Sequence, residues 1–181
     1  MPIPDEYTAV LIKSADGYRF VSNIKQITTH SFSTAINGIP FGLSPAQLVK
    51  VINEKGLELV QPNLDEMPSL DFEPVLDGRH YDIDGSFIYR TACGLAFGYT
   101  ADGENISIAN IGNYDLPTAE GLKLGDSIAK IIEIYGDDYD KEAHVVSSVY
   151  QYFNGKEYLR IIVSDNVVFR WSILTSGGLN Y

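Results

Sequence analysis

Cysteine, histidine and positive charge are scarce in this chain of 181 residues. Its single cysteine, Cys93, excludes an internal disulfide, and the apolar, strand-like surroundings without a neighbouring histidine favour a buried inert thiol over a nucleophile. The three histidines, His30, His80 and His144, lie far apart, and none has a neighbour at ligand or catalytic spacing. No run of 18 apolar residues occurs, which excludes a transmembrane helix.

The chain contains 13 lysines and arginines and 24 aspartates and glutamates, which gives a formal net charge of −11. A nucleic-acid-binding protein needs a basic surface to replace counterions, so this balance argues against nucleic acid as a partner. The same balance argues against an anionic membrane surface. Solubility alone, docking to a basic partner and mimicry of DNA all remain open as reasons for the acidic composition.

The N-terminus, Met1 to Glu6, has neither the basic region nor the apolar segment of a secretory signal peptide. If Met1 is the native start, a cytoplasmic protein is expected. If the chain is a trimmed mature segment, the protein is secreted or lipid-anchored, and the sequence leaves both interpretations open.

One short sequence pattern occurs twice, and the second copy lies 83 residues after the first. The first copy, 38–44, leads into an apolar run at 48–52, and the second, 121–127, leads into another at 131–135. Ser44-Pro45-Ala46-Gln47 predicts a helix start with a capping box, and Gly56 predicts its end. Ser127 predicts the start of a second short helix that ends at Gly136.

Three strands are predicted after each helix, at about 86–91, 93–100 and 105–110, and at about 145–153, 158–163 and 167–174. Asn154-Gly155 predicts a hairpin turn between two of them. In the last strand, side chains alternate between the two faces, so every second residue is expected to point toward the helix and the others outward. The inward set is Val167, Phe169, Trp171 and Ile173, and the outward set is Val168, Arg170 and Ser172.

The predicted fold class is α+β, with two tandem units that each pack a short helix on an antiparallel β-meander. Residues 7–13, a turn at 14–17 and strands at 18–22 and 24–32 add an N-terminal β-hairpin to the first unit. The proline-rich stretch 61–79 predicts a long loop, which is a mild functional hint. A boundary near residue 115 divides the chain into a first unit, 1–115, and a second unit, 116–181.

The second half resembles a recurring bacterial module: the small domain of outer-membrane assembly lipoproteins and the repeat of beta-lactamase inhibitor protein. The residues that carry this resemblance are Gly121, Leu124, Gly125, Ser127, Ile131, Tyr135, Gly136, Tyr150, Tyr152 and Gly155. The first half matches over residues 38–52 and loosely thereafter. The resemblance implies helices that back a sheet whose other face binds a partner, although this chain cannot form the disulfide common in the inhibitor-type repeat.

Two groups of acidic residues raise the alternative of a metal site. They are Asp77, Asp82 and Asp84, and Asp137, Asp138, Asp140 and Glu142. The first group lacks the spacing of a calcium-binding loop, so turn formation is the simpler interpretation. The second is explained by a solvated loop or by a patch for a basic partner. A hydrolase remains an alternative only if the two groups meet around one metal ion.

The aromatic and arginine residues of the last three strands are the candidate binding site. Tyr150, Tyr152, Tyr158, Arg160 and Arg170 are expected on an outward sheet face with the chemistry of interaction hot spots. Half-buried sheet tyrosines are the competing interpretation. The predicted function is a non-catalytic protein-binding module, inhibitor-like or immunity-like, with no catalytic residues, metal or cofactor. The alternative is a cell-envelope lipoprotein domain with a structural or adhesion role.

Overall fold

The computed structural model describes residues 7–14, 17–25, 29–63, 65, 68–111, 117–144 and 146–175, and for 7–25, 142 and 143 it describes the backbone. The chain is a mixed α+β protein, as the sequence predicts. Its elements are β1 (Tyr7–Ser14), β2 (Gly17–Lys25), α1 (Pro45–Glu54), β3 (Arg79–Tyr81), β4 (Phe87–Arg90), β5 (Leu95–Tyr99), β6 (Asn105–Asn110), α2 (Ile128–Tyr135), β7 (Asp140–Ala143), β8 (Ser148–Phe153), β9 (Glu157–Ser164) and β10 (Val167–Thr175).

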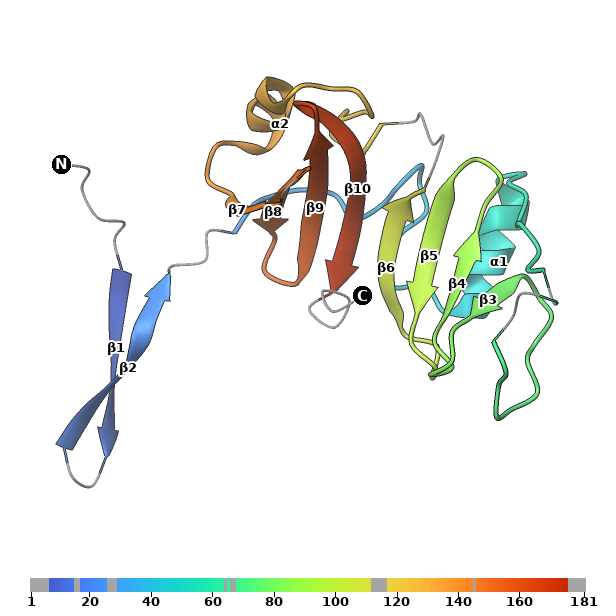
Figure 1. Cartoon of the computed structure of the whole chain (residues 1–181), viewed down its shortest axis with the longest axis horizontal. Coiled ribbons are helices and arrows are strands. Elements are labelled where there is room, and N and C mark those ends of the chain that lie inside the picture. The colour runs from blue at the N-terminus through green and yellow to red at the C-terminus, as the bar shows by residue number, and fades with distance from the viewer. Residues whose placement is uncertain are drawn as a thin grey trace.

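Strands β3 to β10 form one antiparallel sheet in the order β3-β4-β5-β6-β10-β9-β8-β7 (Figure 1). At its centre β6 pairs with β10, with Ile108 opposite Ile173, so hydrogen bonding runs through both halves of the chain. The edge strands β3 and β7 were not predicted. They contain three and four residues, without an apolar alternation, and only pairing with β4 and β8 makes them strands.

Both helices pack on the same face of the sheet, which we call the covered face. Leu48 and Ile52 of α1 and Ile131 and Tyr135 of α2 belong to one buried core cluster with alternate residues of the strands. Across six strands one row of paired residues lies in this core: Tyr89, Phe97, Ile108, Ile173, Leu159 and Tyr152. The segment 29–43 adds Phe32, Ile36 and Ile39 to the cluster. It runs past β9 and β10 toward α1 in Figure 1.

The two helix starts are confirmed. The Ser44 hydroxyl accepts a hydrogen bond from the Gln47 N–H, and the Gln47 side chain accepts one from the Ser44 N–H, which completes the capping box. At the start of α2, the Ser127 hydroxyl accepts a hydrogen bond from the Lys130 N–H. Two residues before each cap, Gly42 and Gly125 have φ angles of 82° and 84°. Both copies of the repeated pattern therefore adopt the same backbone conformation at these positions.

The predicted N-terminal hairpin is confirmed as β1 and β2, which pair only with each other in the described sheets. The structure has no separate strand over 24–32 among its described residues. Instead β2 ends at Lys25, and Thr29 forms an isolated bridge with Phe153. The described residues of the loop 61–79 form no α-helix and no strand before β3 begins. The boundary expected near residue 115 lies outside the described residues.

Candidate functional site

The five residues predicted as one binding face divide between the two faces of the sheet. Tyr150 and Tyr152 are buried in the core, at 2% and 1% exposure, and the prediction that they face outward is wrong. Tyr158 and Arg160 are half-buried on the opposite face, and Arg170 is exposed there. The candidate site therefore retains three of the five residues.

Strand register explains this division. Tyr152 pairs with Leu159, and Leu159 points away from its neighbour Tyr158 because side chains alternate along a strand. Alternation within β8 and within β9 follows from the sequence, whereas the relation between the two strands depends on their pairing. A slip of one residue would have placed all the tyrosines on one face.

Tyr152 instead fixes α2 to the sheet. Its hydroxyl donates a hydrogen bond of 2.9 Å to the carbonyl oxygen of Gly136, the residue that ends α2. Its ring centroid lies 5.0 Å from that of His30 and 5.3 Å from that of Tyr135. Burial raises the pKa of the Tyr152 hydroxyl above its ordinary value. This tyrosine thus joins three segments of the core.

The face opposite the helices, which we call the open face, is defined by strand alternation and register. Its positions are His80, Ile88, Arg90, Ala96, Gly98, Ser107, Ala109, Asp140, Glu142, Val149, Gln151, Phe153, Tyr158, Arg160, Ile162, Ser164, Arg170, Ser172 and Leu174. Among the described residues, α1, α2 and the core side chains of segment 29–43 all belong to the cluster on the other face.

Small side chains occupy the centre of the open face. One row of paired positions runs from Arg90 through Ala96, Ala109 and Ser172 to Arg160. The adjacent row has Gly98 and Ser107 at the corresponding strands, flanked by Ile88 on one side and by Leu174 and Tyr158 on the other. A Cβ atom at Gly98 would collide with the Ser107 hydroxyl, so the glycine allows this close approach. The surface at the centre of the open face therefore lies closer to the sheet backbone than the surface on either side, where the side chains are longer.

A β-bulge in β10 changes the predicted orientation of its first residues. The register shifts between Val168 and Arg170, which leaves Phe169 as the extra residue. Val168 is consequently buried at 2%, whereas Val167 and Phe169 are 40% and 67% exposed. The expectation that Val167 and Phe169 face the helix and Val168 faces outward is wrong. The buried positions of Trp171 and Ile173 are as predicted.

Asn110 of β6 holds the bulge in place. Its side-chain oxygen accepts a hydrogen bond of 2.6 Å from the Trp171 N–H, and its backbone oxygen accepts one of 3.2 Å from the Arg170 Nε. Asn110, Ile111, Phe169 and Arg170 line a shallow depression of about 260 Å³ beside the seam between β6 and β10. Phe169 is a candidate binding residue that sequence reasoning missed, because its strand alternates without any mark of a bulge.

A second depression of about 250 Å³ lies toward the β3 edge. Gly98, Ser107 and Ile88 line it together with the charged or titratable residues Arg90, His80 and Asp82. The His80 Nε2 lies 3.0 Å from the carbonyl oxygen of Val60, which orients the ring at the rim. Polar groups around a partly apolar hollow are typical of places where a partner side chain inserts.

The open face contains charges of both signs. Its positions include Arg90, Arg160 and Arg170, three of the five arginines in the protein, and also Asp140 and Glu142 of β7, which pair with Gln151 and Val149. At the opposite edge, Asp82 lines the hollow that also contains Arg90 and His80. The arginines of this face are therefore accompanied by a similar number of carboxylates, whereas the whole chain has a net charge of −11.

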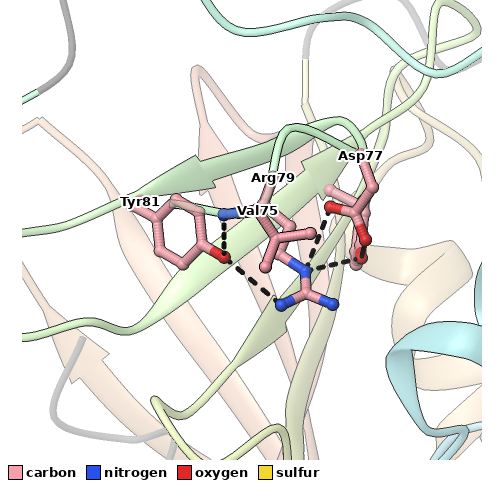
Figure 2. Close-up of polar contacts among 5 residues, drawn as sticks. Val75, Asp77, Arg79 and Tyr81 are labelled. Atoms are coloured by element: carbon pink, nitrogen blue, oxygen red, sulfur yellow. Dashed lines mark hydrogen bonds and ion pairs between the residues drawn. The ribbon is translucent and has the colours of Figure 1, made fainter. Parts of the chain in front are cut away.

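A polar cluster on the other side of β3 and β4 anchors the end of the long loop (Figure 2). The Arg79 Nε lies 3.1 Å from the Asp77 carboxylate and donates a hydrogen bond of 2.9 Å to the Tyr89 hydroxyl. The Tyr81 hydroxyl accepts hydrogen bonds from Arg79 and from the N–H of Val75. Burial raises the pKa of the Tyr89 hydroxyl. The Tyr89 hydroxyl in turn donates a hydrogen bond of 3.0 Å to the Asp77 carboxylate, so these side chains bind one another, which indicates a structural role.

The two acidic groups do not meet. Asp77, Asp82 and Asp84 lie next to β3 and the second group lies next to β7, at opposite edges of the sheet. Seven strand spacings, about 34 Å, separate these edges, so the groups cannot share one metal ion. Within the residues that the structure describes, no cluster of three or more metal-ligating side chains occurs.

Asp84 forms a turn, as the simpler interpretation held. Its carboxylate accepts hydrogen bonds from the N–H and the hydroxyl of Ser86, and these bonds lower the pKa of Asp84. Cys93 is half-buried, in the turn between β4 and β5, and its sulfur lies 3.2 Å from the Thr91 hydroxyl. The thiol is therefore neither inside a strand nor fully buried, contrary to expectation.

Comparison of the chain with protein-family models, with curated proteins and with solved structures finds no match. None of the helices in the described part of the chain has the length and apolar character needed to cross a membrane. Functional reasoning therefore rests on the geometry of the open face.

Proposed function

We propose that this chain is a non-catalytic protein-binding module, inhibitor-like or immunity-like, that holds its partner on the open face. The observation that carries the proposal is the asymmetry of the sheet. One face is filled by both helices, and the other presents arginines and aromatic rings around a low centre. Arginine, tyrosine and other aromatic residues supply most of the energy at protein interfaces.

The residues proposed to contact the partner are Tyr158, Arg160 and Arg170, to which we add Phe169 and Arg90. The Tyr158 ring packs on Phe153 with centroids 4.6 Å apart, so it is held in position before binding. Phe169 is 67% exposed beside Arg170. Side chains that are already ordered lose less conformational entropy on binding, which favours affinity.

The proposal includes an architecture of two tandem units. Corresponding positions of the two units can be compared by their separation in the sequence. The helix caps Ser44 and Ser127 are 83 residues apart, whereas Tyr89 and Tyr152, which lie in one buried row, are 63 residues apart. The difference of 20 residues equals the excess of the loop 55–78, of 24 residues, over the loop 136–139, of four. Each helix is followed by four antiparallel strands, which supports the resemblance to beta-lactamase inhibitor protein as a proposal about origin.

The test is affinity capture with the purified chain and a lysate of the native host. The variant carries Tyr158→Ala, Arg160→Ala and Arg170→Ala. The matched control carries Lys50→Ala, Lys55→Ala and Lys123→Ala, which removes the same number of side chains from exposed sites on α1 and on the loops beside the two helices. Circular dichroism confirms that both variants are folded.

A protein retained by the wild type and the control but lost from the open-face variant supports the proposal. Equal retention by all three proteins contradicts it and places the partner elsewhere. Absence of any specific protein from the wild-type sample also contradicts it and favours the cell-envelope alternative.

A further inference from the structure

The hairpin of β1 and β2 has two outer strand edges that no other described strand covers. A two-stranded hairpin is at best marginally stable in water, and long exposed strand edges pair with other chains. We infer that this hairpin, which we call the arm, is exchanged between two copies of the chain: the arm of each copy adds its strands to the β7 edge of the other. The inference goes beyond the proposed function and does not depend on it.

The sequence of the arm suits strands that join a larger sheet. Nine of the 17 residues in its two strands are aliphatic or aromatic. Leu11 pairs with Phe20, and its neighbour Ile12 pairs with Arg19, so apolar positions occur on both faces of the hairpin. A small sheet needs a third strand or a helix packed against it to be stable by itself. The arm therefore needs a sheet to join.

The root of the arm lies at one edge of the eight-stranded sheet. β7 is the last strand at this edge, and its outer side pairs with no other described strand. Where β8 extends past β7, Thr29 bridges Phe153, and the His30 N–H donates a hydrogen bond of 2.6 Å to the Phe153 carbonyl oxygen. Lys25 ends β2 four positions before Thr29, a span of at most about 14 Å. The segment that carries the arm is thus already paired with this edge.

The arm is placed to reach a second copy of the chain. In Figure 1 it projects away from the sheet on the side of β7, and it pairs with no strand of that sheet. Its backbone N–H and C=O groups can extend the free β7 edge of another copy, which is the mode by which extended segments add strands to a sheet. The exchange is reciprocal, so two arms and two edges close a two-fold dimer.

Charge favours the pairing of arm with edge over a direct contact between two β7 edges. Residues 1–25 contain three bases and three acids, so residues 26–181 carry the whole net charge of −11. The three bases, Lys13, Arg19 and Lys25, belong to the strands of the arm, and the three acids lie outside these strands in the sequence. Residues 137–142, at the β7 edge, contain four acids and one lysine. Like charges destabilise paired strands and opposite charges stabilise them, so a β7 edge pairs better with the arm than with another β7 edge.

The first test is sedimentation equilibrium of the full chain, with charges exchanged between the two surfaces. The arm variant carries Arg19→Glu and Lys25→Glu. The edge variant carries Asp138→Lys and Glu142→Lys. Circular dichroism confirms that each variant is folded.

A matched variant controls for the change in net charge. It carries Lys50→Glu and Lys123→Glu, which change the net charge exactly as the arm variant does, at exposed positions on α1 and on the loop before α2. The matched variant is expected to dimerise within threefold of the wild type.

The wild type is expected to be dimeric at about 100 μM, and the arm and edge variants to have dissociation constants at least tenfold higher. An equimolar mixture of the arm and edge variants is expected to regain the dimer. In this mixture the reversed arm meets the reversed edge and the native arm meets the native edge, so both contacts again join opposite charges.

Three outcomes of this test overturn the inference. The first is a wild type that is monomeric at about 100 μM. The second is a dimer that neither variant weakens, or that the matched variant weakens equally, because another surface then holds the copies together. The third is loss of the dimer in both variants without recovery in the mixture, which shows that the arm does not meet the edge of the other copy.

Thermal stability should depend on protein concentration for the same reason. In a monomeric sample the arm pairs with no other strand of the described sheets, so it adds little to the free energy of unfolding. In a dimeric sample association stabilises the folded state. The melting temperature of the wild type is expected to rise with protein concentration and that of the arm variant to stay constant, and a constant value for both contradicts the exchange.

A final measurement uses the wild type alone and distinguishes contact between copies from contact within one chain. Equal amounts of unlabelled and isotopically heavy protein are mixed and treated with a carbodiimide, which joins lysine amines to carboxylates in contact with them. Peptides that join Lys13 or Lys25 to the acids of residues 137–142 are expected to include pairs with one light and one heavy member. Pairs of a single isotope alone place the arm on its own β7 edge and overturn the exchange, as does the absence of joined peptides.

Discussion

Replacing Tyr152 by alanine tests the placement of the tyrosines directly. The side chain is 1% exposed, its ring contacts those of His30, Tyr135 and Tyr139, and its hydroxyl bonds the last turn of α2. Truncating a buried aromatic ring costs about 3–5 kcal/mol, and loss of a buried hydrogen bond adds about 1 kcal/mol. Tyr152→Ala is expected to lower the free energy of unfolding by about 4–6 kcal/mol, a large part of the total for a domain.

Tyr158→Ala is the matched control on the open face. This ring is half-buried and stacks on Phe153, an aromatic pair that contributes about 0.5–1.5 kcal/mol. The expected loss is therefore about 1 kcal/mol. Tyr152→Phe isolates the hydroxyl and should also cost about 1 kcal/mol, since it leaves the ring in place and removes only the hydrogen bond.

The assay is urea unfolding followed by fluorescence of Trp171, the single tryptophan, which is fully buried. For a chain of this length the melting temperature falls by about 2–4 °C per kcal/mol, so Tyr152→Ala should melt about 8–24 °C lower. A loss below about 1.5 kcal/mol for Tyr152→Ala, or an equal loss for Tyr158→Ala, refutes the assignment of these tyrosines to opposite faces.

Three further outcomes are expected. Gly42→Ala and Gly125→Ala should each cost about 1–2 kcal/mol in urea unfolding, because both glycines have positive φ and nothing within 4 Å of the added methyl offsets the strain; an unchanged midpoint contradicts this backbone. Burial raises the pKa of the Tyr99 and Tyr135 hydroxyls, so the native state keeps protons that the unfolded chain loses above about pH 10. Below that pH the two tyrosines should not affect the unfolding free energy, and above it each should lower the unfolding free energy by up to about 1.4 kcal/mol per pH unit. An unfolding free energy that stays constant up to pH 11 contradicts their burial. Deleting residues 1–26 should change the unfolding free energy of the monomer by less than about 1 kcal/mol, since within the described sheets β1 and β2 pair only with each other, and an unfolded deletion variant refutes this independence.

Local chemistry made the helix starts predictable. Ser44, Pro45 and Gln47 form a capping box within four residues, and no distant contact is needed to specify it. The turn at Asn154 was predictable for the same reason, because its side chain accepts hydrogen bonds from the N–H groups of Lys156 and Glu157. Most strands after each helix were also found, since their apolar residues recur along the chain.

The edge strands and the bulge were not predictable in this way. β7 consists of Asp140, Lys141, Glu142 and Ala143, a sequence typical of a loop, and it becomes a strand because β8 offers hydrogen-bonding groups. The bulge at Phe169 depends on Asn110, 59 residues earlier, whose side chain bonds the Trp171 N–H. Both features arise from partners that are distant in sequence.

The sequence by itself determined the α+β class, the two capped helices and the acidic character, because these depend on neighbouring residues and on composition. The tertiary structure decided which tyrosines enter the core and where the arginines gather. Strand register made this decision: it paired Tyr152 with Leu159 on the covered face and set Arg160 in one row with Arg90 on the other. Pairing between strands is a non-local property, so the composition of the open face becomes visible only when the sheet is assembled.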